Sequence, residues 1–387
     1  MSNIENSLKN LGPVESRKLR KIWINLVSTG SKKLQSLLTL GLIISTCLKT
    51  DLYSTIIKVL EEGRIISKYS REEILEHLFV KLLIDNIKKP IVNQAIYKYI
   101  RRFRRYSILS DEEIFQLKAL NLAINEITSL HENLGDLSNL EMLYLNNNSL
   151  TSLPESLGKL SNLEKLWLSH NRLNYLPESF GNLTNLKEIL LKDNQLTSLP
   201  ESFGNLSNLQ VLYLENNRLS FLPESFGNLS NLQVLVLSEN RLSSLPESFG
   251  NLSNLQVLVL SENRLSSLPE SFGNLSKLQR LSLNKNQLSS LPESFGDLSD
   301  LVDLYLPENQ LTSLPESFEY LTNLKELDLS FNQLNSQAES VLKNLVMTNS
   351  VITRLFTDDF DFSKEIDRNK RGVPAPGRTT VKAAEFY

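Results

Sequence analysis

Between residues 117 and 334, apolar and polar positions recur with a period of 23 residues. The pattern is clearest at residues 230–252, SNLQVLVLSENRLSSLPESFGNL, and residues 253–275 repeat it letter for letter. One asparagine marks each copy without a slip: Asn125, Asn148, Asn171, Asn194, Asn217, Asn240, Asn263, Asn286, Asn309 and Asn332. Because one copy cannot bury its own leucines, the period predicts a solenoid in which successive copies stack and share a continuous core.

Each copy contains a short stretch that predicts a β-strand. In Leu235-Val236-Leu237 the leucines point inward and the residue between them points outward, as alternation along a strand requires. Stacking then predicts a parallel sheet with one strand per copy. The marker asparagine is expected to turn inward after the strand and to bond backbone groups of neighbouring turns, since buried polar groups need partners. A second apolar column predicts a stacked spine behind the leucines: Phe180, Phe203, Phe226, Phe249, Phe272, Phe295 and Phe318.

Written around the marker, the pattern is L-x-x-L-x-L-x-x-N-x-L-x-x-L-P-x-x-F-G-x-L. At these residues the chain resembles the leucine-rich repeat family. It is most similar to the intracellular 23-residue class with LPxxhGxL ends, which occurs in bacterial repeat proteins, plant Ras-group repeat proteins and animal Ras scaffolds. The resemblance implies an α/β leucine-rich-repeat solenoid with a curved parallel sheet and ten repeats. It also implies that the concave face of the sheet is the usual binding surface.

Two columns of strand residues are expected on that concave face, four and six positions before each marker. Their apolar members form a predicted partner-binding strip: Tyr144, Trp167, Leu190, Val211, Tyr213, Val234, Val236, Val257, Val259 and Tyr305. The leucines already supply the core, so an exposed apolar strip indicates an interaction surface. The preference of β-branched residues for strands is an alternative explanation of the valines. It does not explain Trp167 between Tyr144 and Tyr213, which are the expected anchors.

The repeats divide the chain into predicted domains. Residues 1–110 form a basic α-helical head that also caps the solenoid, and residues 111–334 form the repeats. Residues 335–356 are expected to form a C-terminal capping helix and strand, and residues 357–387 an extended or disordered tail. Ser110 and Glu113 form a capping-box sequence for a helix over residues 111–118, which leads into the first strand.

The head differs from the repeats in charge. Residues 1–110 hold 20 Lys and Arg against 9 Asp and Glu, a balance of +11, whereas the remainder holds 21 against 35, a balance of −14. Four head residues lie at i, i+3, i+4 and i+7 of a predicted helix and would share one face: Lys98, Arg101, Arg102 and Arg105. This face could bind phosphate groups of nucleic acid or of an anionic membrane. Alternatively, it is a solvated face, or it pairs with the acidic repeats.

The sequence contains no recognisable catalytic constellation. The three histidines, His77, His131 and His170, have no Cys or carboxylate neighbours at metal-ligand spacing, and no phosphate loop, dinucleotide fingerprint or nucleophile elbow occurs. We therefore expect no enzymatic activity, no cofactor, no metal and no small-molecule substrate. The single cysteine, Cys47, and the absence of a signal peptide in residues 1–10 favour the cytoplasm.

These observations predict a non-catalytic protein–protein interaction scaffold or adaptor that binds a protein partner on the concave face. The alternative is an adaptor tethered through its basic helical head to an anionic membrane or to nucleic acid.

Overall fold

The computed structural model describes residues 94–358, 360–362 and 366. The chain divides into two compact units, Met1–Asn93 and Gln94–Tyr387, and the described residues all belong to the second. The predicted helices of residues 1–93 and most of the predicted tail lie outside the described residues. No helix in the described part of the chain is both long enough and apolar enough to cross a bilayer.

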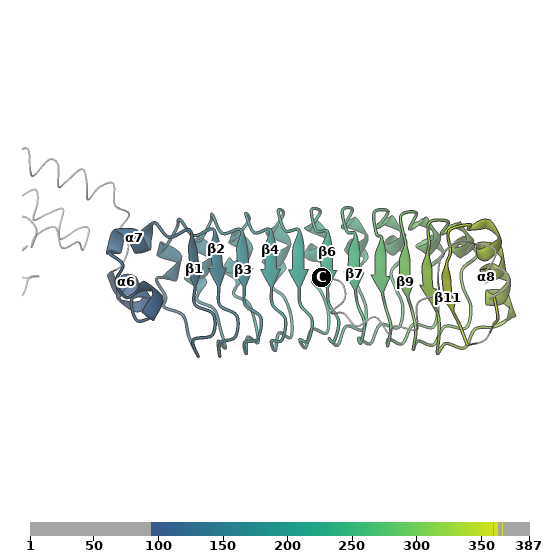
Figure 1. Cartoon of the computed structure of the whole chain (residues 1–387), viewed down its shortest axis with the longest axis horizontal. Helices are drawn as coiled ribbons and strands as arrows, with labels where there is room; N and C mark the ends of the chain where they lie inside the picture. The colour runs from purple at the N-terminus through teal and green to yellow at the C-terminus, as the bar shows by residue number, and fades with distance from the viewer. Residues whose placement is uncertain (1–93, 359, 363–365, 367–387) are drawn as a thin grey trace, which may run out of the picture. The chain divides into compact units, whose positions relative to one another are not determined.

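The core of the described unit is an eleven-stranded parallel sheet in which each strand pairs with the next along the chain (Figure 1). Ten strands come from the ten repeats, and β11 follows them. The strands are β1 Ala119–Asn121, β2 Met142–Tyr144, β3 Lys165–Trp167, β4 Glu188–Leu190, β5 Val211–Tyr213, β6 Val234–Val236, β7 Val257–Val259, β8 Arg280–Ser282, β9 Asp303–Tyr305, β10 Glu326–Asp328 and β11 Arg354–Phe356. The predicted α/β repeat solenoid is confirmed.

On the opposite side of the sheet from its open face, each of the first nine repeats returns through a 3-10 helix. A proline with extended backbone precedes most of these helices, for example Pro246 with φ −68° and ψ 154°. The 3-10 helices are η2 Leu134–Asp136, η3 Glu155–Lys159, η4 Glu178–Asn182, η5 Glu201–Asn205, η6 Glu224–Asn228, η7 Glu247–Asn251, η8 Glu270–Asn274, η9 Glu293–Asp297 and η10 Glu316–Tyr320. Proline suits the position before the helix because its fixed φ matches the turn.

The leucine columns and the phenylalanine column fill the space between the strands and the 3-10 helices. Leu235 and Phe249 are fully buried, as are their counterparts in most repeats. From Phe180 to Phe318 the rings stack face to face, with centroids 5.9 to 6.2 Å apart and interplanar angles of 1° to 11°. The predicted spine is confirmed.

The marker asparagines form the predicted ladder of buried amides. Asn240 Nδ2 donates to the backbone oxygens of Leu214, Leu237 and Ser238 at 2.9, 3.1 and 3.2 Å. Its Oδ1 accepts from the backbone N–H of Leu219 at 3.0 Å. From Asn148 to Asn332, each amide therefore joins its own strand to the preceding repeat, which explains why the asparagine recurs at a fixed position.

Glycine in the 3-10 helices is required by the close approach of the next repeat. A Cβ atom at Gly227 would lie 2.2 Å from the backbone oxygen of Ser248 in the next repeat. The final copy has Glu319 at this position, where helix α8 (Ser336–Thr348) follows instead of another 3-10 helix. Close packing between repeats, rather than chain direction, selects the glycine.

Helical segments lie at both ends of the repeats. Before β1 come α6 (Gln94–Ile100), η1 (Arg104–Tyr106) and α7 (Asp111–Phe115). The Ser110–Glu113 capping box is present, although α7 ends at Phe115 rather than at residue 118. The Tyr106 hydroxyl accepts from the backbone N–H of Asn121 at 2.8 Å, so this segment is joined to the edge of β1. At the other end, α8 lies within the segment 335–356 that was expected to contain a capping helix, and Asn335 caps it.

Candidate functional site: the open face of the sheet

The open face is the surface of the sheet that points away from the 3-10 helices, and it corresponds to the predicted concave face. Each strand presents its first and third residues there, while the middle residue is buried. In-register pairing joins these residues into two rows. One row runs through Tyr144, Trp167, Leu190, Tyr213, Val236, Val259, Ser282 and Tyr305, and the other through Val211, Val234 and Val257.

Aromatic residues gather at the start of the first row. The rings of Tyr144 and Trp167 lie edge to face with centroids 4.7 Å apart. Trp167 Nε1 donates to Glu188 Oε1 at 2.8 Å, and Glu188 Oε2 accepts from Lys165 Nζ at 2.8 Å. Both rings are half-buried, as are Leu190 and Tyr213. The indole is therefore fixed in orientation while part of its surface stays accessible, which suits an anchor for a partner.

The prediction that the whole strip is exposed is wrong at two valines. Val236 and Val259 are only 4% and 2% exposed, whereas Val211, Val234 and Val257 in the other row are half-buried. Both buried valines stand in the middle of the first row, and each has a neighbour on the adjacent strands about 4.8 Å away. A short side chain in such a closely spaced row offers little surface. The accessible part of the first row therefore runs from Tyr144 to Tyr213, and the three valines of the other row continue it.

Tyr305 is separated from the other strip residues. Ser282 stands between Val259 and Tyr305 in the row, and ion pairs flank the tyrosine, Arg280–Asp303 at 3.1 Å and Arg354–Glu326 at 3.1 Å. Burial, together with the charges of Glu326 and Asp303, raises the pKa of Tyr305. The ring lies in a charged setting rather than in a contiguous apolar strip.

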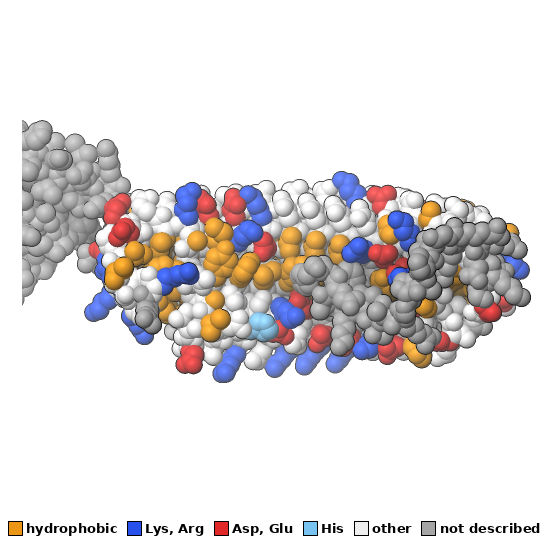
Figure 2. All heavy atoms as spheres, in the orientation of Figure 1, with side chains coloured by type: hydrophobic (Ala, Val, Ile, Leu, Met, Phe, Trp, Pro, Cys, Tyr) orange, Lys and Arg blue, Asp and Glu red, His pale blue; other side chains and the backbone are white. Residues whose placement is uncertain are grey.

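The space-filling view agrees with this arrangement. Figure 2 shows hydrophobic side chains in a band along the strands, with Lys, Arg, Asp and Glu side chains on both sides of it. Part of this rim is paired between repeats, for example Lys285 with Glu262 at 2.8 Å and His170 with Asp193 at 3.0 Å. A partner on the band would therefore meet an apolar centre with a charged edge.

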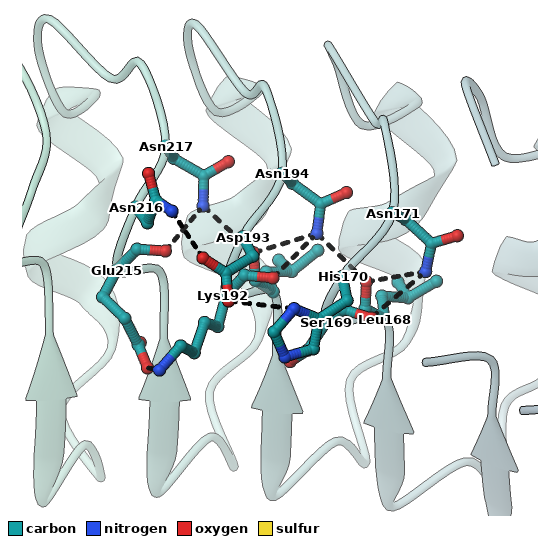
Figure 3. A network of polar contacts seen from close by, with 11 residues as sticks. Leu168, Ser169, His170, Asn171, Lys192, Asp193, Asn194, Glu215, Asn216 and Asn217 are labelled. Atoms are coloured by element: carbon teal, nitrogen blue, oxygen red, sulfur yellow. Dashed lines mark hydrogen bonds and ion pairs between the residues drawn. The ribbon is translucent and has the colours of Figure 1, made fainter. Parts of the chain in front are cut away.

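One polar residue on this face, Glu215, was not predicted from the sequence. Glu215 follows β5 by two residues and is 6% exposed. Lys192 Nζ lies 3.6 Å from its Oε1 atom, and Figure 3 shows the two side chains side by side. Burial raises the pKa of the Glu215 carboxyl, and the nearby Lys192 lowers it less. A signal did exist, because Glu215 is the only acid in the column two positions before the markers.

The basic face predicted from Lys98, Arg101, Arg102 and Arg105 is not continuous. Helix α6 ends at Ile100, and Arg105 lies in the separate helix η1. Arg101 Nε donates to the backbone oxygen of Leu109 at 2.8 Å, and its guanidinium pairs with Asp111. Arg102 lies over the ring of Tyr99 at 5.8 Å. The i to i+7 spacing therefore does not place these residues on one helical face, because the chain turns to bring Arg101 to Asp111.

The described residues hold no group of three or more His, Cys, Asp or Glu side chains that could bind a metal ion. His131 contacts the Tyr99 ring, with centroids 5.6 Å apart, and His170 lies at the rim beside Asp193. His77 lies outside the described residues. Neither of these two histidines therefore belongs to a cluster that could bind a metal ion.

A sequence profile of the leucine-rich repeat region matches residues 101–194, 189–263 and 248–357. The chain belongs to the leucine-rich repeat family. The matched region spans all ten strands of the repeats and β11, so the family assignment rests on the repeats together rather than on one copy. A search of curated protein sequences gives no significant match.

Solved structures with the same fold include ligand-bound receptors. The plant peptide hormone receptor RGFR1 in complex with RGF2 is 32% identical with a TM-score of 0.56, covering 63% of this chain and 40% of the receptor. A Drosophila Toll–Spatzle complex is 28% identical with a TM-score of 0.55, covering 64% and 34% of the two chains. PEPR1–AtPEP1 is 33% identical with a TM-score of 0.51, covering 62% and 38%. This chain thus spans less than half the length of these proteins.

Proposed function

We propose that this chain is a non-catalytic interaction scaffold or adaptor that binds a protein partner on the open face of its repeats. One observation carries the proposal: Trp167 and Tyr144 pack edge to face on that surface, half-buried, with the indole held by Glu188. Such aromatic pairs are not needed by the leucine core, and Trp and Tyr dominate binding energies at interfaces. We place this activity in the cytoplasm, as the single Cys47 suggests.

The rigidity of the repeats supports the proposal. Asparagine amides and the stacked phenylalanine rings fix successive strands, so the surface is formed before a partner arrives. A preformed surface loses little conformational entropy on binding. Similar structures provide an analogy, because the plant receptor RGFR1 is in complex with RGF2 and Toll is in complex with Spatzle.

Site-specific photo-crosslinking in cells of the native source tests this function. A photoreactive amino acid at Leu190 is expected to capture a discrete partner, and the same residue at Tyr175 is the matched control. Tyr175 is 51% exposed and lies between β3 and η4, away from the strands.

The double substitution Tyr144→Ala/Trp167→Ala should abolish capture at Leu190, whereas Tyr175→Ala should leave it intact. Each anchor is expected to contribute about 2 kcal/mol or more, which corresponds to about a 30-fold change in affinity. Capture that is equal at Leu190 and Tyr175, or insensitive to the double substitution, would contradict binding on the open face.

A further inference from the structure

Two buried polar groups on the open face have unused hydrogen-bonding capacity. Glu215 is 6% exposed and Ser238 is 3% exposed. The Glu215 Oε2 atom and the Ser238 Oγ atom are buried and have no hydrogen-bond partner. Buried polar atoms without partners are uncommon and costly, so each needs an explanation.

The two groups occupy the same position in consecutive repeats. Each stands two residues before its marker asparagine, Asn217 or Asn240, and two residues after a row residue, Tyr213 or Val236. Since β5 and β6 pair in register, Glu215 and Ser238 are neighbours across the sheet, next to the apolar strip. In the following repeats the same column is satisfied internally, because Ser261 Oγ donates to Asn284 Oδ1 at 2.5 Å and contacts Ser282 Oγ at 2.8 Å.

The nearby groups only partly satisfy Glu215. Lys192 Nζ approaches the other carboxylate oxygen, Oε1, at 3.6 Å, which is longer than a hydrogen bond. Asp193, on the same rim, adds a like charge. Within the described residues, no hydrogen bond reaches Oε2.

The chemistry of that donor follows from the two acceptors. A carboxylate accepts hydrogen bonds only, and a serine hydroxyl can accept as well as donate. A guanidinium presents several N–H donors in one plane and can reach two neighbouring acceptors, whereas an ammonium is a single point charge. Bringing a cation to a buried carboxylate also removes the cost of leaving that charge uncompensated.

We propose that Glu215 and Ser238 form an arginine-binding subsite, which receives a guanidinium of a partner peptide segment whose apolar side chains contact Tyr144, Trp167 and Leu190. This inference rests on the proposed function and deepens it. The partner is thus a peptide segment that joins an arginine to aromatic or aliphatic residues. The anchors lie on β2, β3 and β4, and the subsite residues follow β5 and β6, so Leu190 and Glu215 belong to neighbouring repeats.

Selection from a displayed random peptide library against the full-length chain tests the subsite. Wild type is expected to enrich peptides with an arginine at a fixed distance from an apolar pair. A selected peptide should bind Glu215→Gln about 30-fold more weakly, the loss typical of breaking a buried charge pair. Glu201→Gln is the matched control, because Glu201 is exposed at the start of η5 and lies away from the open face.

A double-mutant cycle isolates the contact. Replacing the peptide arginine by glutamine should weaken binding to wild type as much as Glu215→Gln does, and the two changes together should cost little more than one. A peptide with lysine in place of the arginine should bind wild type more weakly than the arginine peptide and more tightly than the glutamine peptide. Ser238→Ala should weaken binding of the arginine peptide less than Glu215→Gln does. Circular dichroism of each variant confirms that the fold is retained.

The outcomes separate the subsite from the proposed function. Peptides that depend on Trp167 but carry no arginine, or whose arginine does not couple to Glu215, overturn the subsite and leave the open face as a binding surface. Failure to select any peptide that depends on Trp167 overturns both.

Discussion

At the residue scale, the position just before each marker asparagine adopts an unusual backbone conformation. Glu239, Glu262, Lys285 and Glu308 have φ between 54° and 56°. This left-handed region is unfavourable for residues with a Cβ atom, and Asn tolerates it best after glycine. Asn147 and Asn216 already occupy it in other repeats. The acidic residues at these positions therefore carry backbone strain, which lowers the free energy of unfolding.

We predict that Glu239→Asn stabilises the protein. The substitution relieves the left-handed strain and should raise the free energy of unfolding by about 0.5 kcal/mol. Urea denaturation monitored by circular dichroism measures the change. Glu224→Asn is the control, because Glu224 begins η6 and is not among the residues with positive φ. An equal gain at both positions would contradict the strain argument.

Glu215 gives a second prediction at this scale, concerning pH. Burial raises its pKa, so the ionised form is disfavoured in the folded state even though Lys192 opposes the effect and Asp193 adds to it. The penalty is present above the raised pKa and is lost as pH falls through it. Glu215→Gln should therefore stabilise the free protein by about 1 kcal/mol at neutral pH.

This gain should shrink at acidic pH, where the wild-type carboxyl is protonated and resembles the amide. The urea midpoints of wild type and of Glu215→Gln, measured at neutral and at acidic pH, give the gain at each pH. A gain that is independent of pH would show that ionisation of Glu215 is not its cause.

At the element scale, the asparagine ladder and the phenylalanine spine join one repeat to the next. Asn240→Ala removes the acceptor of the Leu219 N–H and a donor to the Leu214 oxygen. Leaving such buried groups unpaired should cost about 2–4 kcal/mol of unfolding free energy. Asn228→Ala, an exposed asparagine at the end of η6, should change it by less than about 0.5 kcal/mol. Similar losses at the two positions would contradict the structural role of the ladder.

The spine gives a graded prediction. Phe249 is fully buried between Phe226 and Phe272, with ring centroids 6.2 Å from each. Phe249→Ala should cost about 3–5 kcal/mol because it leaves a cavity. Phe249→Leu should cost clearly less, since Leu157 fills the same column in an earlier repeat. Thermal and urea unfolding of both variants measure the order, and an equal loss would contradict it.

At the scale of the whole molecule, the repeats behave as stacked units that contact mainly their neighbours. Residues 230–252 and 253–275 are identical, and strands β6 and β7 have the same burial pattern. Removal of residues 253–275 should therefore give a folded chain with nine repeats and lower stability, because every new junction copies an existing one. It should still bind the partner through Tyr144 and Trp167.

Circular dichroism and urea denaturation measure this deletion. Removal of residues 253–264 is the control, since it breaks the 23-residue period and should prevent cooperative folding. A nine-repeat chain that fails to fold would show that contacts beyond nearest neighbours are required.

The sequence alone determined the parts of the structure that depend on periodicity. Each copy meets nearly the same copy on both sides, so the leucine and phenylalanine columns, the asparagine ladder and the two rows of the open face follow from counting in steps of 23. The outward column that contains Tyr144 and Trp167 was predicted for the same reason, and pairing in register confirms that its members are adjacent.

Only the tertiary structure decided features that depend on specific neighbours. The burial of Val236 and Val259, and of Glu215 with an unpaired oxygen, depends on what surrounds each side chain on adjacent strands. Helix α6 ends at Ile100 and Arg101 turns to Asp111, because an ion pair across ten residues competes with helical spacing. A repeat pattern fixes the position of a residue in its repeat and the face of the sheet to which it belongs. Burial and charge pairing also depend on contacts that the pattern does not contain.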